Sequence, residues 1–361
     1  MNLAKVEAVD KQLHAIHPYP CKFPGAIVRN YLDEPGLVVL DPFCGSGTTL
    51  LEAAMFGSSV VGIDVNPIAV MISKAKLAKL TSENFTQLSD LARTVKSWHG
   101  QFGNKLPDFH GRDHWFSEGA QIAFGFLRGE IDALGRETDI WNVAAVALSA
   151  IVNRFSNQDT ETRYARVERN PEPVAITEAF AVKLDTLAKG LKARGEFHES
   201  VAAQIILGDI RTDTEIAAES IDRIVTSPPY ANTMDYYLYH KQRMNVLGFD
   251  FKVAQNSEIG SRYEFSSKKA PKEKWDEDYA AALKNVHTKL KRGGIAIYVI
   301  GDSQIAGEHI DGGLMTVRLA EQLGFDAEIL DSTSMSGKSK LFNHAFQSKN
   351  KQEHIVRMIK N

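Results

Sequence analysis

The sequence contains little cysteine, and it lacks both long apolar runs and a large excess of charge of either sign. The 361 residues contain two cysteines, Cys21 and Cys44, which excludes a disulfide framework and suits a reducing compartment. No stretch approaches the roughly 18 uninterrupted apolar residues of a membrane-spanning helix, and the first residues lack the apolar run of a signal peptide. We therefore expect a cytoplasmic protein that does not enter a membrane.

Charge is nearly balanced, because 42 Lys and Arg stand against 45 Asp and Glu, for a formal net charge of −3. This balance excludes a histone-like protein that binds nucleic acid through its total charge, although a local basic face stays open. With 43% hydrophobic and 24% charged residues, the composition is that of a globular protein. The length predicts roughly two domains.

Apolar runs rich in β-branched residues alternate with helical segments along much of the chain, which is typical of βαβ units. The five runs that we expect to form parallel strands are 37–43, 58–65, 202–210, 221–230 and 293–303. An amphipathic helix precedes the fifth run and is expected to stop at Gly293-Gly294. Two more strands at 325–330 and 353–359 are expected to supply an antiparallel edge. The pattern predicts an α/β fold built on one mostly parallel sheet.

Residues 81–200 differ in kind, because apolar residues recur there at helical spacing without alternating strands. The clearest stretches are 123–134 and 141–152, which predict helices within a helical insertion. The following segment, 153–173, is polar and rich in arginine, so we expect a long exposed connection.

A glycine-rich turn follows the first predicted strand and spans Asp41 to Thr49 (DPFCGSGTT). Gly45 and Gly47 allow the backbone to approach a ligand that lies over the end of the sheet. No lysine follows these glycines, which excludes a P-loop, and Leu50 stands where a dinucleotide fingerprint needs a third small residue. The simpler alternative is a tight turn without a ligand.

Aspartates at the ends of three predicted strands favour the ligand over a bare turn. Asp41 would repel a pyrophosphate but would favour a cationic ammonium or sulfonium group. Asp64 ends the second strand, where a carboxylate suits ribose hydroxyls, and Asp209 follows the third strand, where it suits an adenine amine. A nucleoside with a cationic tail and no phosphate is S-adenosylmethionine, which we predict as the cofactor.

A second motif, Thr226-Ser227-Pro228-Pro229-Tyr230, follows the fourth predicted strand. Its two prolines fix the backbone around Ser227 and Tyr230. A heterocyclic exocyclic amine is a weak nucleophile and needs acceptors for its N–H bonds, which the Ser227 hydroxyl and the Pro228 carbonyl supply. Tyr230 offers a flat face on which a flipped base stacks. A Pro-Pro turn that only ends a strand is the alternative for this motif taken alone.

The two motifs together resemble those of the DNA amino-methyltransferases, which methylate cytosine at N4 or adenine at N6. The resemblance implies a Rossmann-like class I methyltransferase core, with a mostly parallel seven-stranded sheet and helices on both faces. It covers 1–80 and 201–361, through Gly301-Asp302-Ser303 and Glu353-His354-Ile355-Val356. The helical insertion, 81–200, precedes the third strand, whereas the family's recognition domain commonly follows it. The insertion therefore either contacts DNA or braces the sheet.

The resemblance also implies which residues form the site. Segment 17–24 is similar to the family's N-terminal cofactor motif. The expected cofactor-binding residues are Asp41, Pro42, Phe43, Gly45, Gly47, Thr48, Asp64, Asp209, His17, Lys22 and Phe23. The expected catalytic residues are Ser227, Pro228, Pro229 and Tyr230, which hold the target base.

Serine in the first position of the Ser227 motif resembles the cytosine-N4 subgroup, because adenine-N6 enzymes more often have Asp or Asn there. We therefore expect a DNA methyltransferase that acts on a flipped cytosine of duplex DNA, with a companion restriction endonuclease as a further expected partner. The alternatives, in order, are adenine-N6 methylation, RNA amino-methylation and an inactive nucleic-acid-binding scaffold. Cytosine-C5 chemistry is set aside because no Pro-Cys pair follows the glycine-rich turn. No metal site is expected, since His14 and His17 lack a cluster of further ligands.

Candidate nucleic-acid contacts lie in three segments. Tyr236, Tyr237 and Arg243 belong to an aromatic and partly basic stretch that would line a nucleic-acid channel, with core packing as the alternative. Arg163 belongs to the arginine-rich connection. Lys268 and Lys269 belong to a lysine-rich loop, for which a solvated loop is the alternative.

Overall fold

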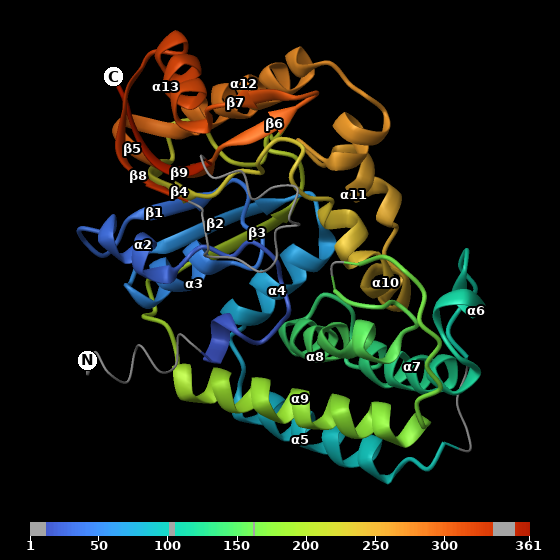
Figure 1. The fold of residues 1–361 in the computed structure, drawn as a ribbon. Coiled ribbons are helices and arrows are strands. Elements are labelled where there is room, and N and C mark those ends of the chain that lie inside the picture. Colours follow the sequence, from blue (N-terminus) through green and yellow to red (C-terminus); the bar gives the residue numbers. More distant parts are fainter. Residues whose placement is uncertain (1–11, 101–104, 162, 335–350) are drawn as a thin grey trace. The chain divides into compact units, whose positions relative to one another are not determined.

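The computed structural model describes residues 12–100, 105–161, 163–334 and 351–361 (Figure 1). Two compact units divide the chain. The helical unit comprises Met1–Tyr19, Pro67–Glu196 and Tyr237–Val253, and the sheet unit comprises Pro20–Asn66, Phe197–Tyr236 and Ala254–Asn361. The helical unit thus includes most of 81–200 together with parts of the chain on either side of that segment. No helix among the described residues is long and apolar enough to cross a membrane.

The sheet unit contains a seven-stranded sheet in the order β3-β2-β1-β4-β5-β9-β8. Strands β1 to β5 run parallel, and β9 runs antiparallel to both β5 and β8. The strands are β1 (Val38–Asp41), β2 (Ser59–Asp64), β3 (Ala203–Leu207), β4 (Ile221–Thr226), β5 (Leu290–Gly301), β8 (Phe325–Ser334) and β9 (Gln352–Lys360). The predicted α/β class, the seven strands and the antiparallel edge are confirmed.

The central strands form because their apolar residues are buried on both faces of the sheet. Val39 and Leu40 of β1 are both 0% exposed, and a parallel strand covered in this way reads as a continuous apolar run. The helices of this unit are α2 (Gly25–Asn30), α3 (Thr48–Met55), the π-helix η1 (Tyr263–Ser267), α12 (Lys272–Lys289) and α13 (Gly312–Gln322). A hairpin of β6 (Ser303–Ile305) and β7 (Glu308–Ile310) also belongs to it, and the short helix α11 (Phe251–Ser257) spans the boundary between the units.

The expected helix stop at Gly293-Gly294 is wrong. Helix α12 ends at Lys289, and both glycines lie within β5. Leu290 already has an extended backbone, is fully buried and pairs with Ile221 of β4. A register shift between Ile221 and Arg223 then absorbs the extra residues around the glycines. Burial of Leu290 in the sheet therefore overrides the local glycine signal.

The helical unit contains α4 (Pro67–Leu77), α5 (Ser82–Ser97), α6 (Arg112–Trp115), α7 (Glu118–Asp132), α8 (Asp139–Phe155), α9 (Pro173–Arg194) and most of α10 (Tyr236–Leu247). Helices α5 and α9 lie side by side (Figure 1), and α8 contacts both α4 and α9. Helix α8 is buried along most of its length, and Thr138 caps its first turn by accepting a hydrogen bond from the Trp141 N–H at 3.2 Å. The helices predicted within 123–134 and 141–152 are thus confirmed as α7 and α8.

The connection between α8 and α9 begins with buried residues, whereas its polar sequence predicts an exposed loop throughout. Ser156, Asn157 and Gln158 are each at most 3% exposed. The Arg169 guanidinium donates to the carbonyl oxygens of Ser156 at 2.7 Å and Asp159 at 2.8 Å. This arginine satisfies buried backbone acceptors that no regular element pairs.

Candidate active site

The glycine-rich turn connects β1 to α3 and depends on two left-handed glycines. Gly45 has φ +47° and Gly47 has φ +72°, a region that side chains rarely adopt. The turn also packs closely on β2, because a Cβ at Gly62 would lie 2.6 Å from Leu50 Cδ1 and 3.2 Å from Cys44 Cβ. Three glycines therefore allow the turn to follow the end of the sheet.

Asp64 holds this turn from the end of β2. Its Oδ2 accepts a hydrogen bond from the Gly45 N–H at 2.8 Å, and its Oδ1 accepts one from the Asn66 N–H at 2.8 Å. Burial raises the pKa of Asp64 to about 6. The carboxylate thus lies beside the turn, as the sequence predicts, and its contact with a ribose stays a prediction.

Asp41 joins the glycine-rich turn to the Ser-Pro-Pro-Tyr motif. Its Oδ1 accepts hydrogen bonds from Thr226 Oγ1 at 2.6 Å and from the Phe43 N–H at 3.2 Å. A second link between the motifs is the hydrogen bond from Thr49 Oγ1 to the Val225 carbonyl at 2.9 Å. Burial raises the pKa of Asp41 to about 7. The structure therefore brings together two motifs that are far apart in the sequence.

The Ser-Pro-Pro-Tyr loop leaves β4 at the same end of the sheet. Ser227 Oγ lies 3.5 Å from the Tyr230 hydroxyl, and that hydroxyl donates to Glu353 Oε1 of β9 at 2.9 Å. Pro228 is buried, and Pro229 is half-buried. Burial raises the pKa of Tyr230 well above its usual value, so the phenol stays protonated and donates. Glu353 is not among the site residues expected from the sequence, where its one signal is its place at the start of the segment Glu353-His354-Ile355-Val356.

Asp209 already bonds a neighbouring arginine, which the prediction of an adenine contact does not take into account. Its Oδ1 accepts from Arg211 Nε at 3.0 Å, and its Oδ2 accepts from Arg211 Nη2 at 2.6 Å. Arg211 also donates to Asp278 Oδ1 at 2.6 Å and to the Ser257 carbonyl at 3.0 Å. This network connects the segment after β3 to α11 and α12. Both carboxylate oxygens of Asp209 take part in it through Arg211.

The N-terminal candidates fall in different units. His17 belongs to the helical unit, is 2% exposed, and has its Nε2 2.9 Å from Ser149 Oγ of α8. Its ring also contacts the ring of His240, with centroids 5.9 Å apart. Lys22 is exposed and Phe23 half-buried in the sheet unit. The predicted cofactor contact of His17 is not supported, because its side chain is enclosed by protein.

Two of the predicted nucleic-acid contacts are enclosed in the helical unit. Tyr237 is 6% exposed and Arg243 is 0% exposed. Arg243 donates to Glu161 Oε2 at 2.5 Å and to the Ser149 carbonyl at 3.1 Å. Core packing, the alternative stated above, describes both residues, since a fully buried guanidinium cannot reach a phosphate.

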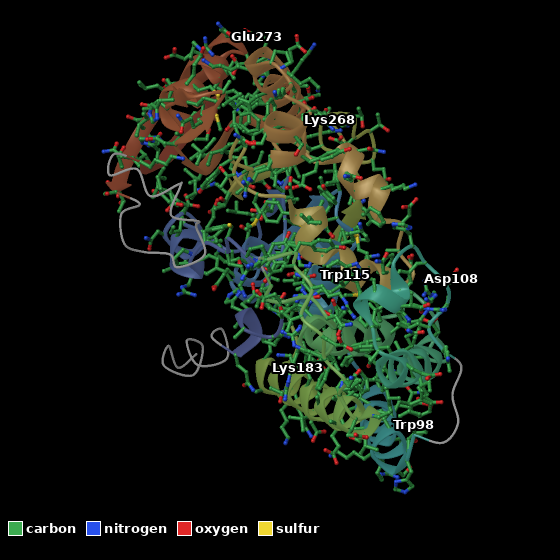
Figure 2. The ribbon with its side chains drawn as sticks, turned by 45° about the vertical axis from the view of Figure 1, so that its right-hand side comes forward. Trp98, Asp108, Trp115, Lys183, Lys268 and Glu273 are labelled. Carbon is green, nitrogen blue, oxygen red and sulfur yellow. The ribbon has the colours of Figure 1, made fainter. Side chains whose placement is uncertain are left out.

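The other predicted contacts have exposed surface. Arg163 is exposed and pairs with Asp159 at 3.1 Å, and Tyr236 is half-buried. Lys268 and Lys269 are exposed (Figure 2 labels Lys268), and Lys268 Nζ lies 4.7 Å from the ring centroid of Tyr263. Their contact with nucleic acid stays a prediction.

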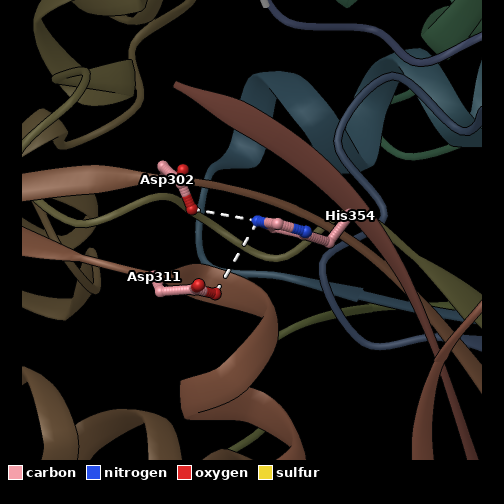
Figure 3. A group of neighbouring side chains, drawn as sticks. All are labelled: Asp302, Asp311 and His354. Atoms are coloured by element: carbon pink, nitrogen blue, oxygen red, sulfur yellow. Dashed lines mark hydrogen bonds and ion pairs between the residues drawn. The ribbon is translucent and has the colours of Figure 1, made fainter. Parts of the chain in front are cut away.

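A further polar cluster lies where β5, β9 and α13 meet (Figure 3). His354 Nε2 lies 3.0 Å from Asp302 Oδ1 and 3.7 Å from Asp311 Oδ1. Its Nδ1 lies 2.8 Å from Ser332 Oγ, and Asp302 Oδ1 also accepts from the Gly312 N–H at 3.2 Å. The protein itself supplies these partners, so we assign the cluster a structural role. The expected lack of a metal site stays a prediction.

The sequence matches a known family at its N-terminal end. The family described as DNA methylase, of the N6 and N4 type, matches residues 4–75, which include the glycine-rich turn. This chain is related to the DNA amino-methyltransferases. The match agrees with the resemblance carried by the two motifs. It supports S-adenosylmethionine as the cofactor.

Three curated relatives of this chain are methyltransferases. The type II methyltransferase M.MvaI from Kocuria varians is 27% identical over 275 residues, covering 68% of this chain and 59% of that protein. M.MjaII from Methanocaldococcus jannaschii is 22% identical, covering 78% and 70%. M.BsoBI from Geobacillus stearothermophilus is 24% identical, covering 67% and 54%. The chain thus spans 59% of the first relative's length.

Among solved structures, a TehB-like SAM-dependent methyltransferase from Corynebacterium glutamicum is 13% identical, with a TM-score of 0.36 and full coverage of both chains. That likeness is too slight to bear on function.

Proposed function

We propose that this chain is a DNA methyltransferase, which transfers a methyl group from S-adenosylmethionine to the N4 amine of a cytosine flipped out of duplex DNA. The observation that carries the proposal is the 2.6 Å hydrogen bond from Thr226 to Asp41. It fixes the residue before Ser227 against the end of β1, beside the glycine-rich turn. Direct methyl transfer requires the methyl donor and the accepting amine to lie next to each other and in line. The two motifs, held together by this bond, would bind them in that way.

The cofactor side of the site fits S-adenosylmethionine. Asp64 would accept hydrogen bonds from ribose hydroxyls, and Gly45 and Gly47 would let the ligand approach the backbone. Asp41 would favour the cationic tail, because a buried carboxylate attracts an ammonium or sulfonium group. When bound, the cofactor supplies a methyl group on a positively charged sulfur.

The base side of the site fits a weakly nucleophilic amine. Ser227 Oγ and the Pro228 carbonyl would accept hydrogen bonds from the amine, and Tyr230 would stack on the extruded ring. The new N–CH₃ bond forms as the S–CH₃ bond breaks, and that electron pair returns to sulfur. The amine loses one proton as it is methylated. No covalent intermediate with the protein is required.

Cytosine is favoured by Ser227, which stands where adenine-N6 enzymes of the family more often have Asp or Asn. Adenine-N6 methylation is the first alternative and RNA amino-methylation the second. We also propose a companion restriction endonuclease as a partner, since the curated relatives are type II methyltransferases. The location in the cytoplasm stays a prediction.

The test is incubation of the purified chain with labelled S-adenosylmethionine and unmethylated DNA, in parallel with RNA, followed by nucleoside digestion and mass spectrometry. We expect N4-methylcytosine in the DNA and a strongly reduced yield in the Ser227→Ala control, which excludes a contaminating enzyme. N6-methyladenine would keep the activity and overturn the choice of base. Label confined to RNA would refute a DNA substrate, and no label anywhere would refute the enzyme.

A further inference from the structure

Glu353 forms the end of a hydrogen-bonded chain that starts at the target-base loop. The Tyr230 hydroxyl donates to Glu353 Oε1 at 2.9 Å, and Ser227 Oγ lies 3.5 Å from that hydroxyl. The second distance is long for two hydroxyl groups, and such bonds commonly tighten when a substrate is in place. Three groups capable of passing a proton therefore lie in sequence.

The strand that carries Glu353 is paired on both sides. In β9 this residue pairs with Gly301 of β5 on one side and with Thr333 of β8 on the other, and neither of these residues has a side chain that ionises. Side chains alternate along a strand, so His354 points to the opposite face, where it bonds Asp302. Glu353 thus lies on the face of β9 that Tyr230 approaches, apart from the His354 cluster.

Within the part of the chain that the structure describes, titratable groups approach Glu353 from two other segments. Tyr230 bonds it directly, and the Cys21 thiol from the loop before α2 interacts with it electrostatically. Lys351, two positions earlier in the chain, acts on Asp302. Glu353 is half-buried, so it retains a path to solvent. A carboxylate with a phenol donor and access to water is suited to accept a proton and release it.

We propose that Glu353 is the positioning residue that accepts, through Tyr230 and Ser227, the proton that the amine gives up as it is methylated. The inference rests on the proposed function. As the N–CH₃ bond forms, the amine proton passes to Ser227 Oγ, the serine proton passes to the Tyr230 oxygen and the tyrosine proton passes to Glu353. The sulfonium charge is lost from the cofactor, the carboxylate becomes a carboxylic acid, and its proton then leaves to water. Each hydroxyl ends as it began.

Two substitutions separate this role from simple support of the tyrosine. Glu353→Gln keeps an oxygen that accepts the Tyr230 hydrogen bond but removes the proton acceptor. Tyr230→Phe keeps the stacking ring but breaks the chain. Glu328→Gln is the matched control, because Glu328 is an exposed carboxylate on the neighbouring strand β8 that pairs with Arg357.

The measurement is the single-turnover methylation rate at saturating cofactor. We expect both site variants to lose at least roughly tenfold in rate with unchanged cofactor affinity, as for removal of a positioned proton acceptor, and the control to match wild type.

The outcomes distinguish the two proposals. If wild type methylates no nucleic acid, the proposed function fails. If wild type methylates DNA and Glu353→Gln keeps the full rate while Tyr230→Phe loses rate, Glu353 only positions the tyrosine and the proton relay is refuted. Melting curves of each variant show that the rates come from folded protein. Glu353→Asp, which keeps a carboxylate on a shorter side chain, should lose less rate than Glu353→Gln, and it replaces Glu353→Gln if that variant is unfolded.

Discussion

Replacing Asp41 by asparagine removes the charge of a carboxyl group that the structure encloses. Asp41 is 2% exposed, and burial raises its pKa to about 7. The asparagine keeps an oxygen for the Thr226 and Phe43 donors, whose bonds are 2.6 and 3.2 Å in wild type. The exchange therefore changes the titration more than the hydrogen bonds, and its effect should depend on pH.

The size and sign follow from the two pKa values. In the unfolded chain an aspartate titrates near 3.9, so between about pH 4 and pH 7 the native state holds a proton that the unfolded state has released. The stabilising contribution is present below about pH 4 and is lost as pH rises through about 7. The difference corresponds to about 4 kcal/mol. The amide does not titrate. The free energy of unfolding of Asp41→Asn minus that of wild type should therefore increase by about 4 kcal/mol when the pH is raised from 4 to 8.

The assay is urea unfolding followed by circular dichroism at several pH values, without cofactor. Asp326→Asn, an exposed position on β8, is the control and should track wild type throughout. Asp64 titrates with the same sign, since burial raises its pKa to about 6, but it is present in every protein compared. A difference between Asp41→Asn and wild type that stays constant within about 1 kcal/mol from pH 4 to pH 8 would refute the argument.

Three other substitutions test the site and its support. Ser227→Ala should lower the methylation rate by roughly 100-fold or more with unchanged cofactor affinity; equal turnover would remove Ser227 from the base side. Asp64→Ala should weaken cofactor binding roughly tenfold or more in calorimetry, because a hydrogen bond to a charged group is worth about 1.5–3 kcal/mol, while the melting curve stays cooperative; unchanged affinity would remove Asp64 from the cofactor side. Arg243→Met should destabilise the helical unit by about 3 kcal/mol, since it removes the guanidinium that lies 2.5 Å from Glu161 and that bonds two backbone carbonyls; an unchanged urea midpoint would contradict that reasoning.

The strands and the edge that carries the site are readable from the sequence because parallel strands impose a simple rule. Continuous apolar runs mark the buried strands, and the carboxyl ends of such strands meet at one edge, where Asp41 and Asp64 lie. The bond between Asp41 and Thr226 follows from that rule once β1 and β4 are neighbours.

Other features depend on contacts that no local pattern encodes. Glu353 reaches the site because β9 enters the sheet beside β5, a pairing between segments far apart in the chain. From the sequence, Arg243 of α10 is expected to be an exposed charge. In the structure it is buried, and Glu161 from the connection after α8 forms an ion pair with it. Arg211 likewise occupies Asp209, and the two residues' proximity in sequence does not reveal the third partner, Asp278.

The position of β9 has a consequence for how the sheet assembles. Strand β9 follows β8 in the chain yet lies between β5 and β8. Until it inserts, β8 has no partner in the sheet, and the acceptor end of the Ser227–Tyr230–Glu353 chain is missing. Insertion of a strand between two others requires non-local pairing, which is slow. Pairing of β9 with β5 therefore completes the sheet and brings Glu353 to Tyr230 at the same time.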